Sequence, residues 1–487
     1  MRSISIIAES RETRDSYAPL VASLLEQNLV DVDIHFVTDI NKSIHFDLLP
    51  NCAKHSTLEN AIQESLGDFL LFVGRSSVLV SNALDTLRQI STDSQQVAVW
   101  YSTQLLKSEG EGNQTTELQP HFSPERLLGD NYLRSGFLIR RDSIVNAFHL
   151  RLKHAFSSLY ELLLQVSWHY PFVGHIRKPL FIEHHNSINE RTQQIESQVV
   201  ADELSRRLVN ADVDVSEYGS RQIRRKIFGD PLVSIIIPTG SQRRIVRGKS
   251  TLLVDQCVNS ILERSTYENL EIIVVQDQRN AIDHSLISWA NVEKVRIVPF
   301  SQGFNFADKC NLGFVHSDGH FVIFLNDDTE VISKDWIETL VGHLQDIGVG
   351  MSGPTLLLED SRIQSASLCN NPAPHNYGAG QLVQDFYLAP QNQIAREVSG
   401  LTGACIALRR DVYTEMGGMC SDFPNNFNDI DLCFKLLYKN YRIIWTPFAQ
   451  LTHFEAQSRD PSVSEEESHS LRSRWGRYFN SDKYTPV

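Results

Sequence analysis

The sequence lacks an apolar run long enough to cross a membrane, and residues 1–9 are too short and too soon interrupted for a signal peptide. Its seven cysteines are odd in number, scattered and without a Cys-x-x-Cys pair, which argues against a disulfide framework and a zinc site. Basic residues are outnumbered, 45 against 59 acidic ones, and the net charge of −14 argues against a protein whose main partner is nucleic acid. These absences predict a reducing, cytoplasmic compartment, where any membrane contact is peripheral and on the inner face.

The composition is that of a folded protein. Apolar residues make up 41% of the chain and charged residues 21%, as in globular domains. A length of 487 residues is too great for one ordinary core and predicts about two to four domains. The chain can therefore bury large cores.

The chain is organised around the stretch from Gly319 to Val331. Residues 321–325 are five large apolar residues in an uninterrupted run, which predicts a strand buried on both faces of a parallel sheet. Asp327 and Asp328 follow at the carboxyl end, where open α/β sheets bind ligands. Carboxylates beside a phosphorylated substrate are what Mg²⁺ or Mn²⁺ prefers, so the pair predicts a metal and donor site. The alternative is that both acids only end the strand and cap a helix over 334–344.

The first half of the chain repeats features of the second half in the same order. Four pairs of segments match: residues 67–77 with 319–329, 138–142 with 407–411, 156–160 with 427–431, and 179–185 with 447–453. The acids are not repeated, because Arg75 and Ser76 stand where the second copy has Asp327 and Asp328. We interpret the pattern as a tandem duplication whose first copy keeps the fold and has lost the chemistry. Chance similarity between two α/β domains is the alternative.

A nucleotide-binding pattern opens the second half. Residues 231–239 predict a buried strand, 252–262 a helix, and 270–275 another strand that ends at Gln276 and Asp277. Strand, helix and strand at this spacing predict a βαβ unit. One such unit alone is a weak signal.

Six motifs in this half resemble those of the family 2 glycosyltransferases, most closely the bacterial polysaccharide and O-antigen branch. They are Pro231 to Thr239, Phe304-Asn305-Phe306 with Asn311, Leu325 to Val331, Leu401 to Cys405, Asn428 to Cys433, and His453-Phe454-Glu455 with Ser458-Arg459. Their order makes the match specific over about residues 225–487. The resemblance implies a GT-A fold, a nucleotide-diphosphate-sugar donor, a divalent cation (Mg²⁺ or Mn²⁺) and inversion at the anomeric carbon. The donor-binding residues that we carry over from it are Pro238, Thr239, Gln276, Asp277, Asn305, Asn311, Asn326, Asp327, Thr402, Ser458 and Arg459.

The chemistry of sugar transfer supports the roles that the resemblance implies for the metal site. Cleaving a sugar from a diphosphate places negative charge on the leaving group, so a cation held by Asp328 and His453 at the β-phosphate would stabilise the transition state. Asp327 is expected to face the ribose, as its counterpart does in similar enzymes. A histidine that is satisfied in the core or exposed at the surface is the alternative for His453.

Asp429 is the candidate catalytic base. It stands at the start of an amphipathic helix pattern through residues 432–437 and can accept the proton of an attacking acceptor hydroxyl. Asp431 points to another face of that helix and is expected to be structural. An N-cap is the alternative role for Asp429, and the two roles are compatible.

Four further segments carry expectations. Arg459 and Ser458 could bind the diphosphate, or make a surface salt bridge. Residues 375–378 lie in a loop-rich stretch where acceptor selectivity would reside. The family usually has an acid directly after the second strand to hold the base, and here Gln276 precedes Asp277, which leaves the base and its exact contact open. The tail from Trp475 onward is expected to pack on the catalytic domain.

These observations predict an α/β protein of two tandem GT-A-like, Rossmann-like domains: residues 1–190, a helical and basic linker over 191–229, and a catalytic domain over 230–487. The linker's basic cluster, Arg221 to Lys226, could meet an anionic partner, although a solvated helix face is the preferred interpretation. The predicted function is inverting, metal-dependent transfer of a sugar to a hydroxyl of a glycan or lipid-linked saccharide in surface-polysaccharide synthesis.

Two other functions compete with this one. A non-catalytic nucleotide-sugar-binding subunit of a glycosyltransferase complex would not need the four candidate residues Asp327, Asp328, Asp429 and His453. A phosphatase with an aspartyl nucleophile would want two acids separated by one residue after the strand, and here they are adjacent.

Overall fold

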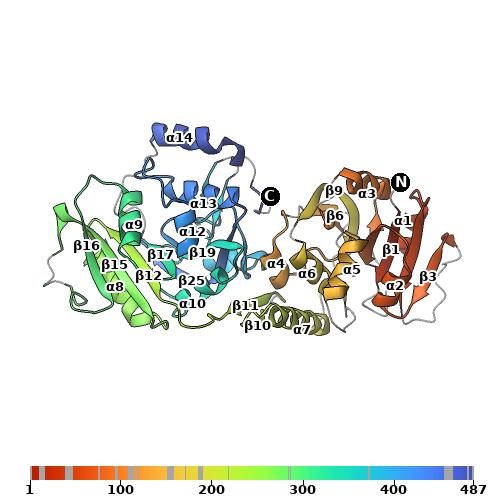
Figure 1. The fold of residues 1–487 in the computed structure, drawn as a ribbon, viewed down its shortest axis with the longest axis horizontal. Helices are drawn as coiled ribbons and strands as arrows, with labels where there is room; N and C mark the ends of the chain where they lie inside the picture. The colour runs from red at the N-terminus through yellow and green to blue at the C-terminus, as the bar shows by residue number, and fades with distance from the viewer. Residues whose placement is uncertain are drawn as a thin grey trace. The chain divides into compact units, whose positions relative to one another are not determined.

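The computed structural model describes residues 3–9, 17–38, 48–74, 77–93, 97–107, 114–117, 120–150, 158–170, 172–184, 190–217, 219–282, 285, 287–370, 373–454, 464–479 and 482–484. The chain forms two compact units, of which the first ends at Arg207 and the second begins at Leu208 (Figure 1). This boundary falls inside the predicted 191–229 linker. Helix α7 (Glu190–Arg206) belongs to the first unit, and the hairpin of β10 (Ala211–Val215) and β11 (Arg221–Arg225) belongs to the second.

The second unit is built on a mixed sheet with the strand order β16-β15-β12-β17-β24-β19-β25-β18. Its main elements are β12 (Val233–Thr239), α8 (Leu253–Arg264), β15 (Leu270–Asp277), β16 (Val295–Phe300), α9 (Phe306–Val315), β17 (Phe321–Leu325), β18 (Thr329–Val331), α10 (Trp336–Leu344), β19 (Val349–Leu357), β24 (Cys405–Arg409), α12 (Arg410–Glu415), α13 (Asn428–Tyr438), β25 (Arg442–His453) and α14 (Glu465–Trp475). Smaller strands and a helix complete it: β13 (Arg243–Val246), β14 (Lys249–Leu252), β20 (Ile363–Ser365), β21 (Leu368–Cys369), β22 (His375–Asn376), α11 (Val383–Phe386) and β23 (Arg396–Glu397).

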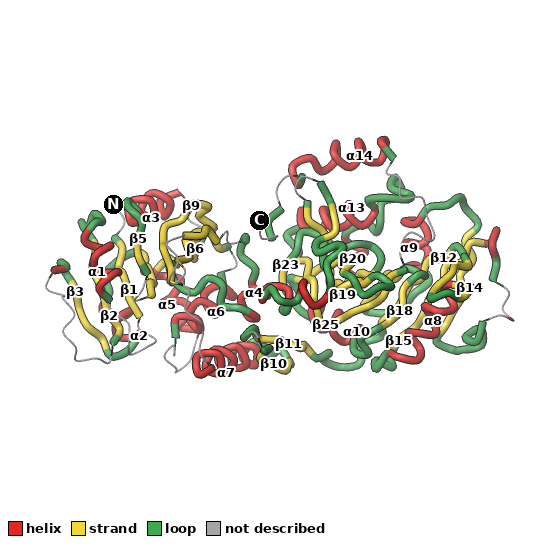
Figure 2. The backbone as a smooth tube through the Cα atoms, turned by 180° about the vertical axis from the view of Figure 1, so that it is seen from behind, coloured by secondary structure: helices red, strands yellow, loops and turns green. Residues whose placement is uncertain are grey.

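Two apolar cores cover the two faces of this sheet, because successive side chains of a strand point to opposite faces. On β12, Ile235 and Ile237 pack with helices α8 and α10, whereas Ile236 packs with α9, α12 and α13. Figure 2 shows the strands of this unit with helices alongside. Strand β17 is buried along its whole length, as its apolar run predicts, but it is parallel only to β12 and antiparallel to β24. The sheet is therefore mixed rather than parallel.

The first unit repeats this topology strand for strand. Its order β3-β2-β1-β4-β8-β6-β9-β5 matches the second sheet position by position, and each corresponding pair of strands has the same relative direction. The elements are β1 (Ile4–Glu9), α1 (Ala18–Leu25), β2 (Val32–Val37), β3 (Cys52–His55), α2 (Leu58–Glu64), β4 (Phe69–Gly74), β5 (Val78–Leu79), α3 (Ala83–Asp93), β6 (Val99–Lys107), β7 (Gln114–Glu117), α4 (Pro124–Gly129), β8 (Phe137–Arg140), α5 (Arg141–Leu150), α6 (Leu159–His169) and β9 (Val173–His184). Such a match of order and direction supports the tandem duplication over chance similarity.

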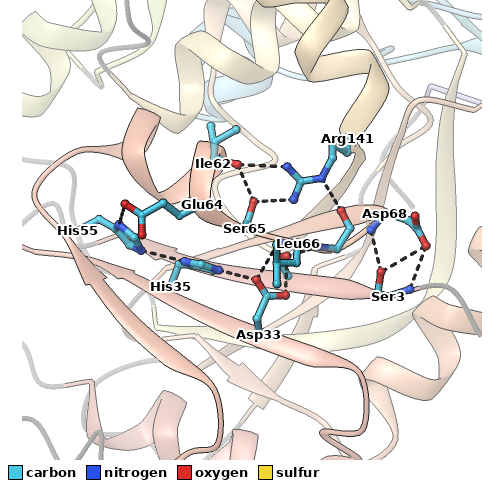
Figure 3. A network of polar contacts seen from close by, with 12 residues as sticks. Ser3, Asp33, His35, His55, Ile62, Glu64, Ser65, Leu66, Asp68 and Arg141 are labelled. Atoms are coloured by element: carbon cyan, nitrogen blue, oxygen red, sulfur yellow. Dashed lines mark hydrogen bonds and ion pairs between the residues drawn. The ribbon is translucent and has the colours of Figure 1, made fainter.

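Polar contacts at the amino ends of the strands are repeated as well. In the first unit, the Ser5 hydroxyl donates to Asp33 and accepts from the Gly67 amide, and Arg141 donates to the Gly67 carbonyl. Figure 3 shows Asp33 and Arg141 within this network of polar contacts. In the second unit, Ser234, Glu271, Gly319 and Arg410 make the same set of contacts. A Cβ on Gly67 would lie 2.4 Å from the Ser5 amide nitrogen, and one on Gly319 would lie 2.5 Å from that of Ser234. Glycine is therefore required at both positions by the close approach of the neighbouring strand.

The basic cluster of the predicted linker is not a helix face. Arg221 to Arg225 form strand β11, and Arg221 itself is buried. Lys226 Nζ lies 2.7 Å from Asp212 Oδ1, and Arg224 lies 3.6 Å from Asp335 and over the ring of Phe448. The sequence interpretation was wrong because the alternation Arg-Gln-Ile-Arg is a strand pattern of period two.

The C-terminal tail packs on the second unit, as predicted. Phe434 of α13 stacks on Tyr478 with ring centroids 5.2 Å apart, and Leu471 and Trp475 join the same apolar cluster. Among the described residues, no helix combines the length and the apolar character that crossing a membrane requires.

Candidate active site

A cavity of about 460 Å³ opens at the carboxyl ends of β12, β15 and β17. This is the edge at which α/β sheets bind ligands, because the connections leave the strands there in different directions. Nine of the predicted site residues line it: Pro238, Thr239, Asp277, Asn326, Asp327, Asp328, Thr402, Asp429 and His453. Residues His375 and Asn376, from the stretch expected to govern acceptor selectivity, line it too.

Asp328 and His453 face each other although they lie far apart in the sequence. Strands β18 and β25 pair Thr329 with His453, and the Phe454 amide donates to the Asp328 carbonyl at 2.9 Å. This pairing places Asp328 Oδ1 3.0 Å from His453 Nε2, and both side chains are buried. The strand register therefore fixes the distance between the two predicted ligands.

The arrangement of these two side chains fits a divalent cation. His453 Nδ1 lies 2.8 Å from Gln364 Oε1, which assigns the proton to Nδ1 and leaves the lone pair of Nε2 directed at the Asp328 carboxylate. Two lone pairs at that separation repel unless a proton or a cation lies between them. Asn326 lines the same wall with its Nδ2 3.3 Å from His453 Nε2, and its buried Oδ1 finds no hydrogen-bond partner among the described residues. The Asp328 carboxylate and the His453 imidazole are ligands that Mg²⁺ or Mn²⁺ accepts.

The side chains of the described residues alone do not complete such a site. Within the part of the chain that the structure describes, no group of three or more His, Cys, Asp or Glu residues could enclose a metal ion. Water and substrate phosphates could supply further ligands to a cation at Asp328 and His453, as they usually do for Mg²⁺.

Asp327 is held differently from its neighbour. Its Oδ2 accepts a hydrogen bond from the Thr239 hydroxyl at 2.5 Å, at the end of the adjacent strand β12. Burial, reinforced by the negative charge of Asp328, raises the pKa of Asp327 to about 7. Lys309 of α9 opposes this effect: its ammonium is buried, donates to the Thr239 carbonyl at 3.0 Å and interacts with Asp327. Burial in turn lowers the pKa of Lys309.

Asp277, at the end of β15, is engaged by a cation from its own loop. Arg279 Nε and Nη2 donate to its two oxygens at 2.9 and 2.5 Å, and the Arg279 amide donates to Oδ1 at 3.0 Å. The Arg279 hydrogen bonds lower the pKa of Asp277 to about 2. The carboxylate is therefore ionised and its exposed guanidinium partner faces the cavity.

Asp429 is oriented by two backbone amides. Its Oδ2 accepts from the Gly403 amide and its Oδ1 from the Ile430 amide, each at 2.8 Å. The side chain is only half-buried and lines the cavity, so one face stays accessible. A Cβ at Gly403 would lie 3.2 Å from the Asp429 Cβ, which leaves little room for any other residue there. Asp429 is thus a fixed carboxylate within the same cavity as Asp328 and His453.

The structure excludes the capping alternatives. Helix α10 has Asp335 as its N-cap, so Asp327 and Asp328 do not cap it. Helix α13 has Phe427 as its N-cap, with a left-handed φ of 63°, and Asp429 lies two residues further on. Asp431 has no exposed surface and is bound by Lys435, Arg474 and Trp475, as expected for a structural acid.

Three predicted donor-binding residues do not line the cavity. Asn305 caps α9 by accepting from the Asp308 amide and donates to the Ser421 carbonyl. Asn311 accepts from the Tyr413 hydroxyl at 2.6 Å and from the Met419 amide. Gln276 is buried within β15 behind the cavity wall. The side-chain amides of Asn305 and Asn311 hold the fold. The buried Nε2 of Gln276 finds no hydrogen-bond partner among the described residues, and Asp277 rather than Gln276 lines the cavity. Ser458 and Arg459 lie outside the described residues.

The sequence analysis did not predict four residues that line the cavity. Lys309 and Arg279 place two cations at the cavity of a chain whose net charge is −14. Gln364 assigns the histidine tautomer, and Asn425 with its neighbours forms the wall before Asp429. Of these four residues, only Lys309 could have been predicted, because it is a lysine on the apolar face of a helix pattern.

A cavity at the carboxyl ends of the strands, a candidate cation site and a half-buried carboxylate in the same cavity define a ligand-binding α/β domain of the nucleotide-binding type. Residues 234–417 match the family model "Glycosyl transferase family 2". The chain therefore contains a family 2 glycosyltransferase domain in its second unit, and the predicted fold class is confirmed.

Two curated relatives match at the level of sequence. The uncharacterised protein y4gI of Sinorhizobium fredii is 32% identical over 275 residues, which cover 53% of this chain and 29% of that protein. The O-antigen biosynthesis protein RfbC of Myxococcus xanthus is 24% identical over 413 residues, 81% of this chain and 31% of that protein. This chain thus spans less than a third of the length of the relatives it matches.

Two solved structures align weakly. GalNAc-T7 with UDP, GalNAc and Mn²⁺ gives a TM-score of 0.40 at 14% identity, covering 51% of this chain and 50% of that chain. The mannosyltransferase PcManGT of Pyrobaculum calidifontis, in complex with GDP-Man and Mn²⁺, gives 0.35 at 17% identity, covering 58% and 70%.

Proposed function

We propose that the second unit is an inverting glycosyltransferase that uses a nucleotide-diphosphate-sugar donor and a divalent cation. The observation that carries this proposal is the meeting of Asp328, His453 and Asp429 in one cavity, at the ligand edge of a family 2 domain. The proposed acceptor is a hydroxyl of a glycan or lipid-linked saccharide in surface-polysaccharide synthesis. The O-antigen assignment of RfbC supports that choice.

In this proposal the acceptor hydroxyl attacks the anomeric carbon while the bond to the diphosphate breaks. Asp429 takes the proton of the attacking hydroxyl, and its two amide contacts keep the carboxylate in place for that transfer. Asp328 and His453 would hold Mg²⁺ or Mn²⁺, which would neutralise charge on the departing diphosphate. Lys309 and Arg279 add fixed positive charge to the donor side of the cavity. Attack from the side opposite the leaving group inverts the anomeric carbon.

The first unit is proposed to be non-catalytic. Its sheet register places Glu183 where the second unit has His453, because Val78 pairs with Ile182 as Glu330 pairs with Thr452. Glu183 Oε1 accepts from the hydroxyls of Ser77 and Ser135 at 2.5 and 2.7 Å, and burial raises its pKa. A carboxyl that is buried and bound in this way is not accessible to a ligand. Residues 75 and 76, which replace the acid pair, lie outside the described residues.

The experiment that tests the proposal is a screen of UDP-glucose, UDP-N-acetylglucosamine, GDP-mannose and dTDP-rhamnose with Mn²⁺ or Mg²⁺, measuring nucleoside diphosphate release. We expect one donor to be turned over, only with metal, and faster when a saccharide acceptor is added. Metal-dependent binding of a donor without any turnover would favour the alternative, a non-catalytic nucleotide-sugar-binding subunit. Peripheral contact with the inner face of a membrane is a further proposal, and vesicle flotation tests it.

A further inference from the structure

Helix α14 packs beside α13, the helix that carries the proposed base (Figure 1). The buried Asp431 of α13 lies 3.1 Å from Arg474 Nη1 and accepts from Trp475 Nε1 at 2.8 Å. These contacts fix the C-terminal end of α14 against α13. They leave its N-terminal end facing the loop before Asp429.

Glu467, in the first turn of α14, binds that loop. Its Oε1 accepts from the backbone amides of Asn425 and Asn426, and its Oε2 accepts from Asn426 Nδ2, each at 3.2 Å. The side chain is only 8% exposed. Ser464-x-x-Glu467 is a capping-box pattern, in which the glutamate ordinarily reaches back to the N-cap amide of its own helix. Here both carboxylate oxygens accept hydrogen bonds from another segment of the chain instead.

The loop bound by Glu467 is part of the cavity wall. Asn425, Asn426 and Phe427 all line the cavity, and Phe427 leads directly into α13 through a left-handed backbone conformation. The Phe427 carbonyl accepts from the Asp431 amide at 2.8 Å, so the loop and the first turn of α13 move together. Glu467 lines a separate groove behind the loop and does not touch the cavity.

We propose that Glu467 is a positioning residue for transfer: it holds the 425–427 wall so that Asp429 meets the acceptor hydroxyl at the correct place. This inference rests on the proposed function of the cavity. A three-hydrogen-bond clamp by a buried carboxylate is a strong local restraint, because charged acceptors form the stronger hydrogen bonds. A displacement of about 1 Å in such a wall costs about 100-fold in rate.

The test compares Glu467→Ala and Glu467→Gln with the matched control Glu466→Ala, an exposed acid one position earlier on the same helix. For Glu467→Ala we expect the kcat of transfer to fall about 10- to 100-fold, with the Kd for Mn²⁺ and the screened nucleotide-sugar within about twofold of wild type. Amide hydrogen exchange over 425–428 should accelerate at least about tenfold. Glu467→Gln should be intermediate, because its carbonyl still accepts from both backbone amides. Glu466→Ala should match wild type throughout.

Two results would overturn the inference: unchanged exchange and kcat in Glu467→Ala, or a donor Kd that worsens as much as kcat falls. The second result would mark Glu467 as a merely structural residue. Should wild-type protein turn over no donor, the proposed function fails. Hydrogen exchange still decides whether Glu467 holds the wall.

Discussion

Replacing Asp429 with Asn tests the proposed base with almost no change in volume. The carboxylate now accepts two backbone amides, from Gly403 and Ile430, at 2.8 Å each. An asparagine can accept only one of them, and its NH₂ group must face the other donor. Loss of a general base costs about 100- to 10,000-fold in kcat, equivalent to about 3–5 kcal/mol of activation free energy. Because the asparagine NH₂ group then faces a backbone N–H, one hydrogen bond is lost, and the free energy of unfolding should fall by about 1–3 kcal/mol.

The assay measures nucleoside diphosphate release at saturating donor, acceptor and metal, together with donor Kd by titration. We expect kcat to fall in Asp429→Asn while donor affinity persists, because the role proposed for Asp429 is to take the proton of the acceptor hydroxyl. Asp360→Asn is the control: this exposed acid does not line the cavity, so its loss should leave both kcat and the melting temperature close to those of the wild type. Transfer by Asp429→Asn within about threefold of wild type, far less than base loss costs, would refute the base assignment.

The remaining predictions concern packing and pH. Gly319→Ala should destabilise the protein by at least about 1–3 kcal/mol in urea unfolding, since its Cβ would lie 2.5 Å from the Ser234 amide nitrogen, whereas Gly303→Ala, with open space around it, should not. Because burial raises the pKa of Asp327 to about 7, the folded state holds a proton that the unfolded state releases near its ordinary value of about 4. The stability of the metal-free protein should therefore fall as pH rises from about 4 to about 7, and Asp327→Asn should flatten that dependence in thermal melts; an unchanged slope would contradict the assignment.

The fold was predictable wherever the sequence has a clear apolar run or a repeated order of segments. The apolar runs of β4, β12 and β17 are long and unbroken, so their burial follows from the sequence alone. The order of the repeated segments likewise predicted two sheets of one topology. Asp328, His453 and Asp429 line one cavity, and the roles expected for them stay predictions.

The predictions that failed depend on tertiary contacts, which the sequence pattern does not show. The alignment of residues 179–185 with 447–453 pairs His185 with His453, whereas the sheet register pairs Glu183 with it, a two-residue shift within an apolar strand. Asn305 and Asn311 carry amides suited to ligand binding, yet a helix cap and a tyrosine occupy them. Arg279 lies in a short loop after β15, where only the folded structure shows that it faces Asp277.

The most direct measurement is a titration of wild-type protein, Asp328→Ala, His453→Ala and the exposed-acid control Asp360→Ala with Mn²⁺ and the screened nucleotide-sugar, followed by thermal unfolding. A donor at 100 times its Kd should stabilise the wild type and the control by about 2.7 kcal/mol, and only with metal. Both site variants should lose that stabilisation. Equal, metal-independent stabilisation of all four proteins would contradict the account.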